Sequence, residues 1–236
     1  MTDTKRVLIV GGGSGVARAL AVNLVADGFE VVLGSRNPQQ VQDKLPEQLR
    51  EVVRSVRLDL ADEDSIAAVA AGGPFEHVVS LAANHANGPI GDLTRDAIHG
   101  AFDAKVVGPL LLAKHLDGVL SEHGAFVFLS GVAAWKPAPG LSVMATTNGA
   151  VSFLAEALAV ELAPHRVVAV SPGIIDSGAW DGMGAGKQEL FEQTAAANPA
   201  RRVGQVEDVV SAIRLALDNT FVTGSTIHVD GGGRLA

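Results

Sequence analysis

The residues whose types and spacing point most clearly to a binding role form a glycine-rich turn near the start of the sequence. Residues 7–17 read VLIVGGGSGVA, so a run of four apolar residues passes directly into a cluster of glycines. Apolar residues then recur at helical spacing up to Leu24. Glycines let the backbone approach a pyrophosphate closely, and the N-terminus of a helix supplies free N–H groups and a positive dipole end. The stretch therefore predicts a dinucleotide cradle, with an ordinary strand-to-helix turn as the alternative.

The residues after the second apolar stretch indicate which dinucleotide such a cradle holds. Residues 30–34 (EVVLG) are followed by Ser35 and Arg36, with no acidic residue at this strand end. A carboxylate there would accept a hydrogen bond from a ribose 2′-hydroxyl and would repel a 2′-phosphate. Arg36 can instead make paired hydrogen bonds to a phosphate, and Ser35 adds a donor. We therefore expect NADP(H) as the cofactor; a solvated surface arginine is the alternative.

Short apolar strands that alternate with helices are expected to position these residues. The predicted strands cover residues 5–10, 30–34, 52–58, 76–82, 125–129, 166–171 and 226–229. The predicted helices cover residues 14–26, 38–49, 62–71, 94–121, 141–163, 188–197 and 206–217. This alternation is typical of an α/β fold, a Rossmann-type doubly wound parallel sheet with helices on both faces. No repeat, linker or low-complexity segment divides the sequence, so we expect one domain over residues 1–236.

Composition restricts the classes of function that need to be considered. A chain of 236 residues with 47% apolar content can bury a large core. The absence of cysteine excludes disulfides, thiolate metal sites and a cysteine nucleophile, and no metal site is predicted. The net charge is −8 and the basic residues are not clustered, which argues against a nucleic-acid partner. No apolar run reaches the length of a membrane span and no signal peptide is recognisable, so we expect a cytoplasmic protein without a membrane partner.

The order of the motifs resembles that of the short-chain dehydrogenase/reductase family over essentially the whole sequence. The family's Thr-Gly-x-x-x-Gly-x-Gly motif corresponds to VGGGSGVA at residues 10–17, and its adenine-contacting acid corresponds to Asp59. Its Pro-Gly-x-x-x-Thr stretch beside the nicotinamide corresponds to PGIIDS at residues 172–177. Its C-terminal signature corresponds to TG at 223–224 and VDGG at 229–232.

The resemblance implies a cofactor site built from the glycine turn and from residues that follow the neighbouring strands. The residues that it assigns to NADP(H) are Gly11, Gly13, Ser14, Gly15, Val16, Ser35, Arg36, Asp59, Leu60, Ala82, Ala83, Lys105, Pro172, Gly173, Ile175 and Ser177.

The same resemblance implies that the family's usual catalytic residues are replaced. The catalytic tyrosine of Tyr-x-x-x-Lys has no counterpart, because the chain contains no tyrosine. Met144 and Asn148 stand at the two positions of that motif, Gly131 stands at the serine with Ser130 one place before it, and Lys105 stands at the asparagine. Reduction of a carbonyl by hydride requires a proton for the developing alkoxide, which a methionine cannot donate. The usual mechanism of the family is therefore excluded.

Three polar residues are candidates to act in place of the missing groups. Lys105, which the resemblance places on a helix face toward the nicotinamide end, could hydrogen-bond the ribose or protonate a substrate oxygen if desolvation lowers its pKa. Ser130 could orient the substrate, and His85, just past the fourth strand, could act as an acid near neutral pH. The alternatives are a lysine on a solvated helix face, a hydroxyl that caps local backbone and a surface-loop histidine.

Two functional hypotheses from different classes follow. The first is an atypical NADP(H)-dependent oxidoreductase that reduces a small apolar carbonyl or an activated C=C or C=N group by hydride transfer. An apolar substrate space is expected from Trp135, Trp180, Met144 and Met183, for which ordinary packing is the alternative. The second is a non-redox protein on the same scaffold: a cofactor-bound lyase, cyclase or isomerase, or an NADP-sensing binding protein. A shared fold does not decide between them.

Two long predicted helices favour self-association. Residues 94–121 and 141–163 resemble the helices that pair in dimers and tetramers of the family, and the second carries many small residues on one side. We therefore expect a homodimer or homotetramer that binds a small-molecule substrate. A scaffold subunit that needs a different partner chain is a further alternative.

Overall fold

A seven-stranded parallel sheet forms the centre of the computed structural model, which describes residues 5–236; residues 1–4 of the predicted domain lie outside the described residues. The strand order is β3-β2-β1-β4-β5-β6-β9, and each neighbouring pair is parallel. The strands are β1 (Arg6–Val10), β2 (Glu30–Ser35), β3 (Val53–Arg57), β4 (Phe75–Ser80), β5 (Leu120–Leu129), β6 (Arg166–Pro172) and β9 (Ser225–Val229). The chain winds outward in both directions from β1, so the predicted doubly wound fold is confirmed.

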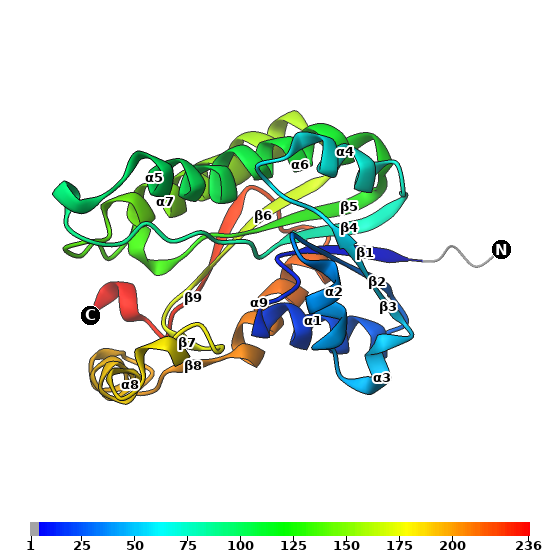
Figure 1. The fold of residues 1–236 in the computed structure, drawn as a ribbon. Coiled ribbons are helices and arrows are strands. Elements are labelled where there is room, and N and C mark those ends of the chain that lie inside the picture. The colour runs from blue at the N-terminus through cyan, green and yellow to red at the C-terminus, as the bar shows by residue number, and fades with distance from the viewer. Residues whose placement is uncertain (1–4) are drawn as a thin grey trace.

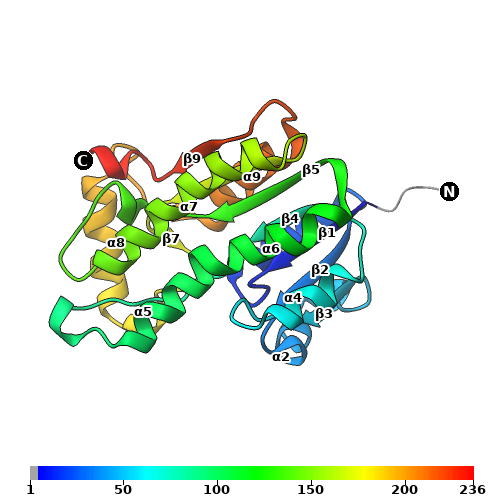
Figure 2. The ribbon, with the colours of Figure 1, turned by 90° about the horizontal axis from the view of Figure 1, so that it is seen from above.

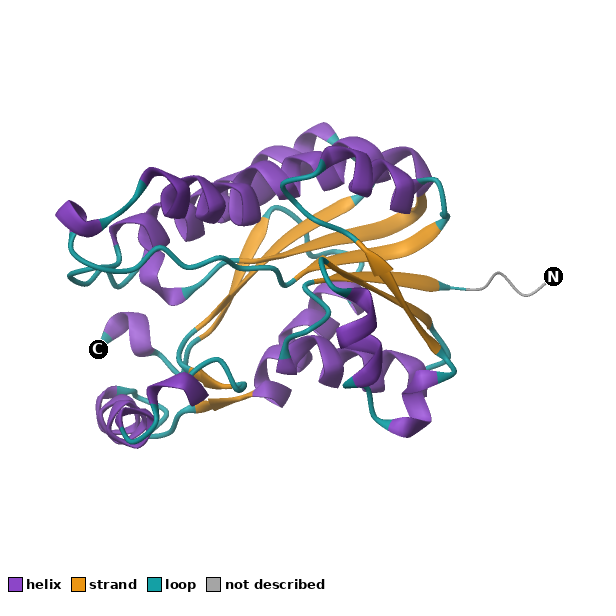
Figure 3. Ribbon diagram, viewed as in Figure 1, coloured by secondary structure: helices purple, strands orange, loops and turns teal. Residues whose placement is uncertain are grey.

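Helices cover both faces of the sheet (Figures 1 and 3). Helices α4, α5, α6 and α7 lie on one face and α1, α2, α3 and α9 on the other (Figure 1). From above, α5, α6 and α7 run across the face that they cover (Figure 2). The helices are α1 (Gly15–Ala26), α2 (Pro38–Asp43), α3 (Glu47–Arg50), α4 (Glu63–Ala70), α5 (Arg95–Phe102), α6 (Gly108–Leu116), α7 (Ser142–Glu161), α8 (Gly186–Ala197) and α9 (Val206–Asp218).

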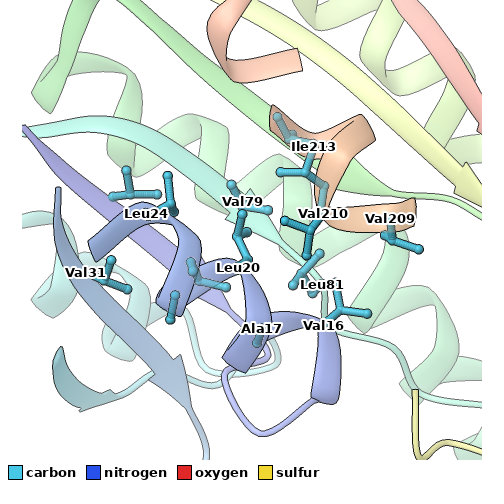
Figure 4. Close-up of a cluster of buried hydrophobic side chains, with 14 of the residues drawn as sticks. Val16, Ala17, Leu20, Leu24, Val31, Val79, Leu81, Val209, Val210 and Ile213 are labelled. Carbon is cyan, nitrogen blue, oxygen red and sulfur yellow. The ribbon is translucent and has the colours of Figure 1, made fainter. Parts of the chain in front are cut away.

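Strand β1 contributes to two separate hydrophobic cores because its side chains alternate between the two faces. Val7 and Ile9 belong to the core beneath α1 and α9, and Figure 4 shows side chains of these two helices meeting beside the sheet. Leu8 and Val10 belong to the core beneath α4, α6 and α7. All four side chains are buried, which explains why this strand is continuously apolar. The glycine turn that follows β1 therefore starts from a strand that is buried on both faces.

Prolines divide two of the predicted helices. The expected helix over residues 38–49 is instead α2 and α3, since Pro46 stands directly before α3 and a residue that precedes proline disfavours helical geometry. The expected helix over residues 94–121 is α5 and α6, joined by a π-helical turn at Asp103–Val107. Pro109 has no N–H with which to reach the carbonyl of Lys105, four residues earlier, and this is the physical reason for the widened turn.

Two further boundaries differ from the sequence-based expectation. Strand β5 starts at Leu120, so the predicted helix ends too late and the predicted strand starts too late. The stretch after β6 contains a small parallel pair, β7 (Ile175–Asp176) and β8 (Gly204–Gln205), which the sequence did not indicate. Between them lies α8, a helix without a buried residue.

Helix α7 corrects one expectation from composition. By length and apolar composition alone it could cross a membrane, so the expectation that no apolar stretch is long enough to do so is wrong. One side of α7, including Val151, Ala155 and Leu158, is buried against the sheet. Phe153 and Val160 on the other side are 72% and 82% exposed.

A histidine side chain accepts a backbone hydrogen bond at the point where β4 and β5 lose their regular register. The register shifts between Phe75 and His77, and there the Ala125 N–H donates to His77 Nδ1 at 3.1 Å. Burial lowers the pKa of His77 to about 4, so the neutral ring is the acceptor at neutral pH. Protonation of Nδ1 would replace that acceptor by a donor facing another donor.

The fold should lose stability in acid through His77. Its folded-state pKa of about 4 lies below the ordinary 6.5, so the unfolded chain binds a proton between these pH values that the folded chain does not. Stability therefore falls as the pH decreases from 6.5 to 4, by about 3 kcal/mol in total. In His77→Asn, an amide oxygen can accept the same N–H without titrating, and urea unfolding at several pH values should show most of this loss removed. Equal acid sensitivity in both proteins would rule out His77 as its source.

Candidate active site

The candidate site lies along the edge where the parallel strands end. In doubly wound sheets ligands bind at this edge, at the point where the strand order reverses. That point lies between β1 and β4, so the loops after these two strands flank it. Helix α8 and the C-terminus lie on the same side of the molecule (Figure 1).

The glycine turn packs so closely that two of its residues admit no side chain. Gly11 has φ +86°, and a Cβ atom there would lie 2.8 Å from the backbone nitrogen of Ala82. A Cβ atom on Gly15 would overlap the carbonyl oxygen of Ser177, in the loop after β7. Two of the predicted cofactor segments, after β4 and after β7, therefore meet the turn itself.

The first turn of α1 follows directly and is capped at its start. Ser14 precedes the helix, and its hydroxyl accepts the N–H of Ala17 at 3.0 Å. Helical geometry leaves the amides of Gly15 and Val16 without partners inside the helix. These amides and the positive end of the helix dipole form the kind of cradle that binds a phosphate.

The ends of β2 and β3 hold the next group of predicted cofactor residues. Ser35 ends β2 with a buried hydroxyl that has no hydrogen-bond partner, and Arg36 beside it is exposed. Asp59 follows β3, half-buried, and accepts the N–H of Ala61 at 3.1 Å. A buried hydroxyl without a partner next to an exposed guanidinium fits an anionic ligand that extends along this edge.

The predicted residues near the middle of the edge form the wall of the site. Leu60 packs against the start of α6, where a Cβ atom on Gly108 would come within 2.7 Å of the Leu60 Cβ. Ala82 lies against Gly11, whereas Ala83, one residue further, is exposed.

Lys105 is buried rather than solvated. Its side chain is on the π-helical turn, and the residue is 3% exposed. The amine donates to the carbonyl of Leu129 at 2.6 Å and to that of Ser130 at 3.3 Å. Burial lowers the pKa of Lys105 to about 8. The alternative of a lysine on a solvated helix face is therefore wrong, and this cation sits at the end of β5.

His85 and Ser130 differ in how free they are to act. His85 is exposed in the loop after β4, and partial burial together with the charge of Lys105 lowers its pKa below the ordinary value. Ser130 is buried, and its hydroxyl donates to the carbonyl of Asn148 at 2.7 Å. The acceptor lies on α7, 18 positions away in the sequence, so the bond is not the cap of local backbone that the sequence left open as the alternative for Ser130.

The loop after β6 is anchored from two sides. Gly173 passes so close to β9 that a Cβ atom on it would lie 2.9 Å from the Asp230 Cα. Beyond β7, Lys187 of α8 bridges Asp176 at 2.9 Å and Asp181 at 2.7 Å. These ion pairs raise the pKa of Lys187. They tie the loop that contains Ser177 to α8, and Lys187 could not be found from the sequence because only the folded loop brings its partners together.

The residues expected to make an apolar substrate space are spread along the same edge. Met144 is buried on α7, whereas Met183 is 49% exposed. Trp180 donates its indole N–H to the Ile175 carbonyl at 3.0 Å, and Trp135 packs edge-on against His228 with ring centres 4.5 Å apart.

Comparisons with known proteins identify similar sequences and structures along the whole chain. A family profile described as enoyl-(acyl carrier protein) reductase matches residues 11–233. The short-chain dehydrogenase/reductase ATR9 of Stachybotrys chlorohalonatus is 30% identical, with 97% of this chain and 96% of that protein covered.

Two solved structures have the same architecture. A small-chain dehydrogenase in complex with NADPH has a TM-score of 0.84 at 29% identity, with 99% of this chain and 100% of that chain covered. The MalC reductase/Diels-Alderase of Malbranchea aurantiaca has a TM-score of 0.88 at 26% identity, with 98% and 96% covered.

The close approach at Gly11 predicts unequal effects of alanine within one turn. Gly11→Ala introduces both a positive φ for a side-chain residue and an overlap with Ala82, so we expect it to destabilise the fold by about 3 kcal/mol. Gly13→Ala is the matched control, because its Cβ would meet nothing closer than a Val41 methyl at 3.8 Å. Urea unfolding measures both, and equal stabilities would contradict the packing described here.

Proposed function

Because the chain belongs to the short-chain dehydrogenase/reductase family, we propose that it is an NADP(H)-dependent oxidoreductase with a non-standard active site. It reduces a small apolar carbonyl, or an activated C=C or C=N group, by hydride transfer without a catalytic tyrosine. The observation that carries this proposal is the glycine turn, whose shape only glycine permits and whose helix offers free amides to a pyrophosphate.

The cofactor site favours the phosphorylated nucleotide. When bound, NADPH supplies the hydride. The exposed guanidinium of Arg36 and the buried, unpartnered hydroxyl of Ser35 fit a 2′-phosphate, and no carboxylate at this strand end would repel one. A small-chain dehydrogenase of the same architecture is known in complex with NADPH, which supports the same choice.

Lys105 is the best source of the proton that a carbonyl reduction consumes. With a pKa of about 8 the amine is mostly protonated at neutral pH, yet it is acidic enough to release a proton to a developing alkoxide. His85 is the weaker candidate, because its lowered pKa leaves the ring mostly neutral at the same pH. Two of the three N–H groups of Lys105 donate to backbone carbonyls, which leaves the third for the substrate.

A non-redox use of the same scaffold is the second candidate. It is favoured by the hydrogen bonds of Lys105 and Ser130, which direct both side chains to backbone carbonyls. The similarity to a protein described as a reductase/Diels-Alderase supports the idea that this architecture accommodates both kinds of reaction. A cofactor-bound lyase, cyclase or isomerase, or an NADP-sensing binding protein, would keep the glycine turn and lack hydride transfer.

The proposal includes self-association and a cytoplasmic location. Helices α6 and α7 present apolar side chains outward, among them Leu110, Phe153 and Val160, which are 44%, 72% and 82% exposed. Covering such a surface with a second copy would remove it from water, which supports a homodimer or homotetramer.

Arg36 should select NADP(H) over NAD(H). Arg36→Ala removes charge-assisted hydrogen bonds to the 2′-phosphate, and we expect the Kd for NADPH to rise about 10–100-fold while that for NADH stays within about twofold. Arg54→Ala, which removes an exposed arginine from β3, is the control and should change neither value. Fluorescence titration measures both cofactors, and an equal loss for NADH and NADPH would contradict the assignment.

Turnover with a panel of carbonyl compounds, activated alkenes and imines tests the function itself. We expect NADPH absorbance to decrease with at least one class, and kcat/KM to decrease as the pH rises through about 8, where Lys105 loses its proton. Lys105→Met should abolish this pH limb and lower kcat by about 100-fold. His85→Gln provides the comparison. If the decrease of kcat/KM with rising pH is lost in His85→Gln and kept in Lys105→Met, His85 is the acid. Tight NADPH binding without consumption in any class would favour the non-redox candidate.

A further inference from the structure

An asparagine side chain of α7 fills the space beside a glycine that lies just after the end of β5. A Cβ atom on Gly131 would lie 2.7 Å from Nδ2 of Asn148, 3.2 Å from its Cγ and 3.4 Å from its Oδ1. The carboxamide therefore occupies the space that any side chain at position 131 would need. Gly131 and Asn148 are 17 positions apart in the sequence but form one unit at the edge where the candidate site lies.

The carboxamide is buried and incompletely paired. Asn148 is 5% exposed, and its Oδ1 is shielded from water without a hydrogen-bond donor in reach. Leaving such a group unpaired costs about 1–3 kcal/mol, so buried side-chain amides are normally satisfied. An unpaired amide oxygen beside a binding edge is best explained by a ligand that donates a hydrogen bond to it, as a hydroxyl group can.

The neighbouring polar side chains already donate hydrogen bonds to backbone carbonyls. The Ser130 hydroxyl donates to the backbone carbonyl of Asn148, and the Lys105 amine donates to the carbonyls of Leu129 and Ser130. The serine hydroxyl has a single proton to donate, and this bond uses it. Lys105 has a third N–H, so it can still deliver a proton, but its position is tied to β5.

We propose that the carboxamide of Asn148 binds the oxygen atom that the reaction converts from carbonyl to hydroxyl, with Oδ1 satisfied by the alcohol form. This inference rests on the proposed reductase function and narrows its substrates to compounds that carry a carbonyl, either as the reacting group or conjugated to a reacting C=C bond. Nδ2–H donates to the carbonyl oxygen, and Oδ1 can accept the hydroxyl of an alcohol product. Because the amide is neutral, it polarises the carbonyl equally at every pH.

The chemical step balances with the groups already named. For a ketone, the hydride forms a new C–H bond at the carbonyl carbon, and the electron pair of the C=O π bond moves to the oxygen. That oxygen, held by Asn148, takes a proton from the Lys105 ammonium to give the alcohol. The reduced cofactor becomes NADP⁺, and Lys105 regains its proton from solvent.

Kinetics of Asn148 variants provide the first test. In Asn148→Ala we expect kcat/KM for the best carbonyl substrate to fall about 100-fold with the Kd for NADPH unchanged. Ser152→Ala is the matched control, because Ser152 is a buried residue one turn further along α7 whose hydroxyl also has no partner. Loss of activity in both variants, or in neither, would overturn the proposal.

A stability cycle tests the Gly131–Asn148 geometry without any turnover. Gly131→Ala should destabilise the chain in the presence of Asn148, because its Cβ overlaps the amide. In an Asn148→Ala background the same change should be close to neutral. Additive effects in urea unfolding would mean that the carboxamide does not occupy this space, and the proposal would fail.

A binding readout separates this proposal from the proposed function. The side-chain amide signal of Asn148, in NADPH-loaded protein labelled with ¹⁵N at asparagine and assigned through Asn148→Ala, should shift when cyclohexanone or cyclohexenone is added. A shift without NADPH consumption would retain the carbonyl site while rejecting the reductase function. If the protein turns over a carbonyl compound and that compound leaves the signal unchanged, or if it turns over none and no tested carbonyl shifts it, the site is wrong.

Discussion

The glycine turn after β1 is the constraint on which the rest of the candidate site depends. Its backbone lies so near Ala82 on one side and Ser177 on the other that Gly11 and Gly15 cannot carry side chains. The turn begins at the end of a strand buried on both faces, and it ends in a capped helix. A ligand that reaches the free amides of α1 is therefore held where the loops after β4 and β7 converge.

The same edge carries a buried positive charge. A buried ammonium, that of Lys105, stands at the end of β5, and in the described part of the chain it makes no ion pair with a carboxylate. Desolvation without a compensating negative charge lowers its pKa into the range where a proton can leave near neutral pH. In the proposed reaction Lys105 would therefore act as the acid in the absence of tyrosine, and Asn148 would hold the oxygen as a neutral group.

Much of the fold was predictable because strand and helix periods alternate clearly along the sequence. The doubly wound order and the glycine turn followed from apolar runs and glycines that act locally. The helix division at Pro46 and the β7–β8 pair were missed, although the proline was a usable signal. The burial of Lys105 could not be predicted, since lysines are rarely buried and its acceptors lie on a distant strand. The Gly131–Asn148 contact likewise exists only once α7 has packed against β5.

Transfer of an isotope from the cofactor to the product shows directly whether NADPH is a reactant in this site. The protein is mixed with NADPH deuterated at both C4 positions and with a carbonyl substrate, and the product is analysed by mass spectrometry and NMR. We expect one deuterium on the former carbonyl carbon, or on the β-carbon of a conjugated alkene, with NADP⁺ formed in equal amount. Product that forms without deuterium, or NADPH that binds and keeps its label with every substrate class, would contradict it.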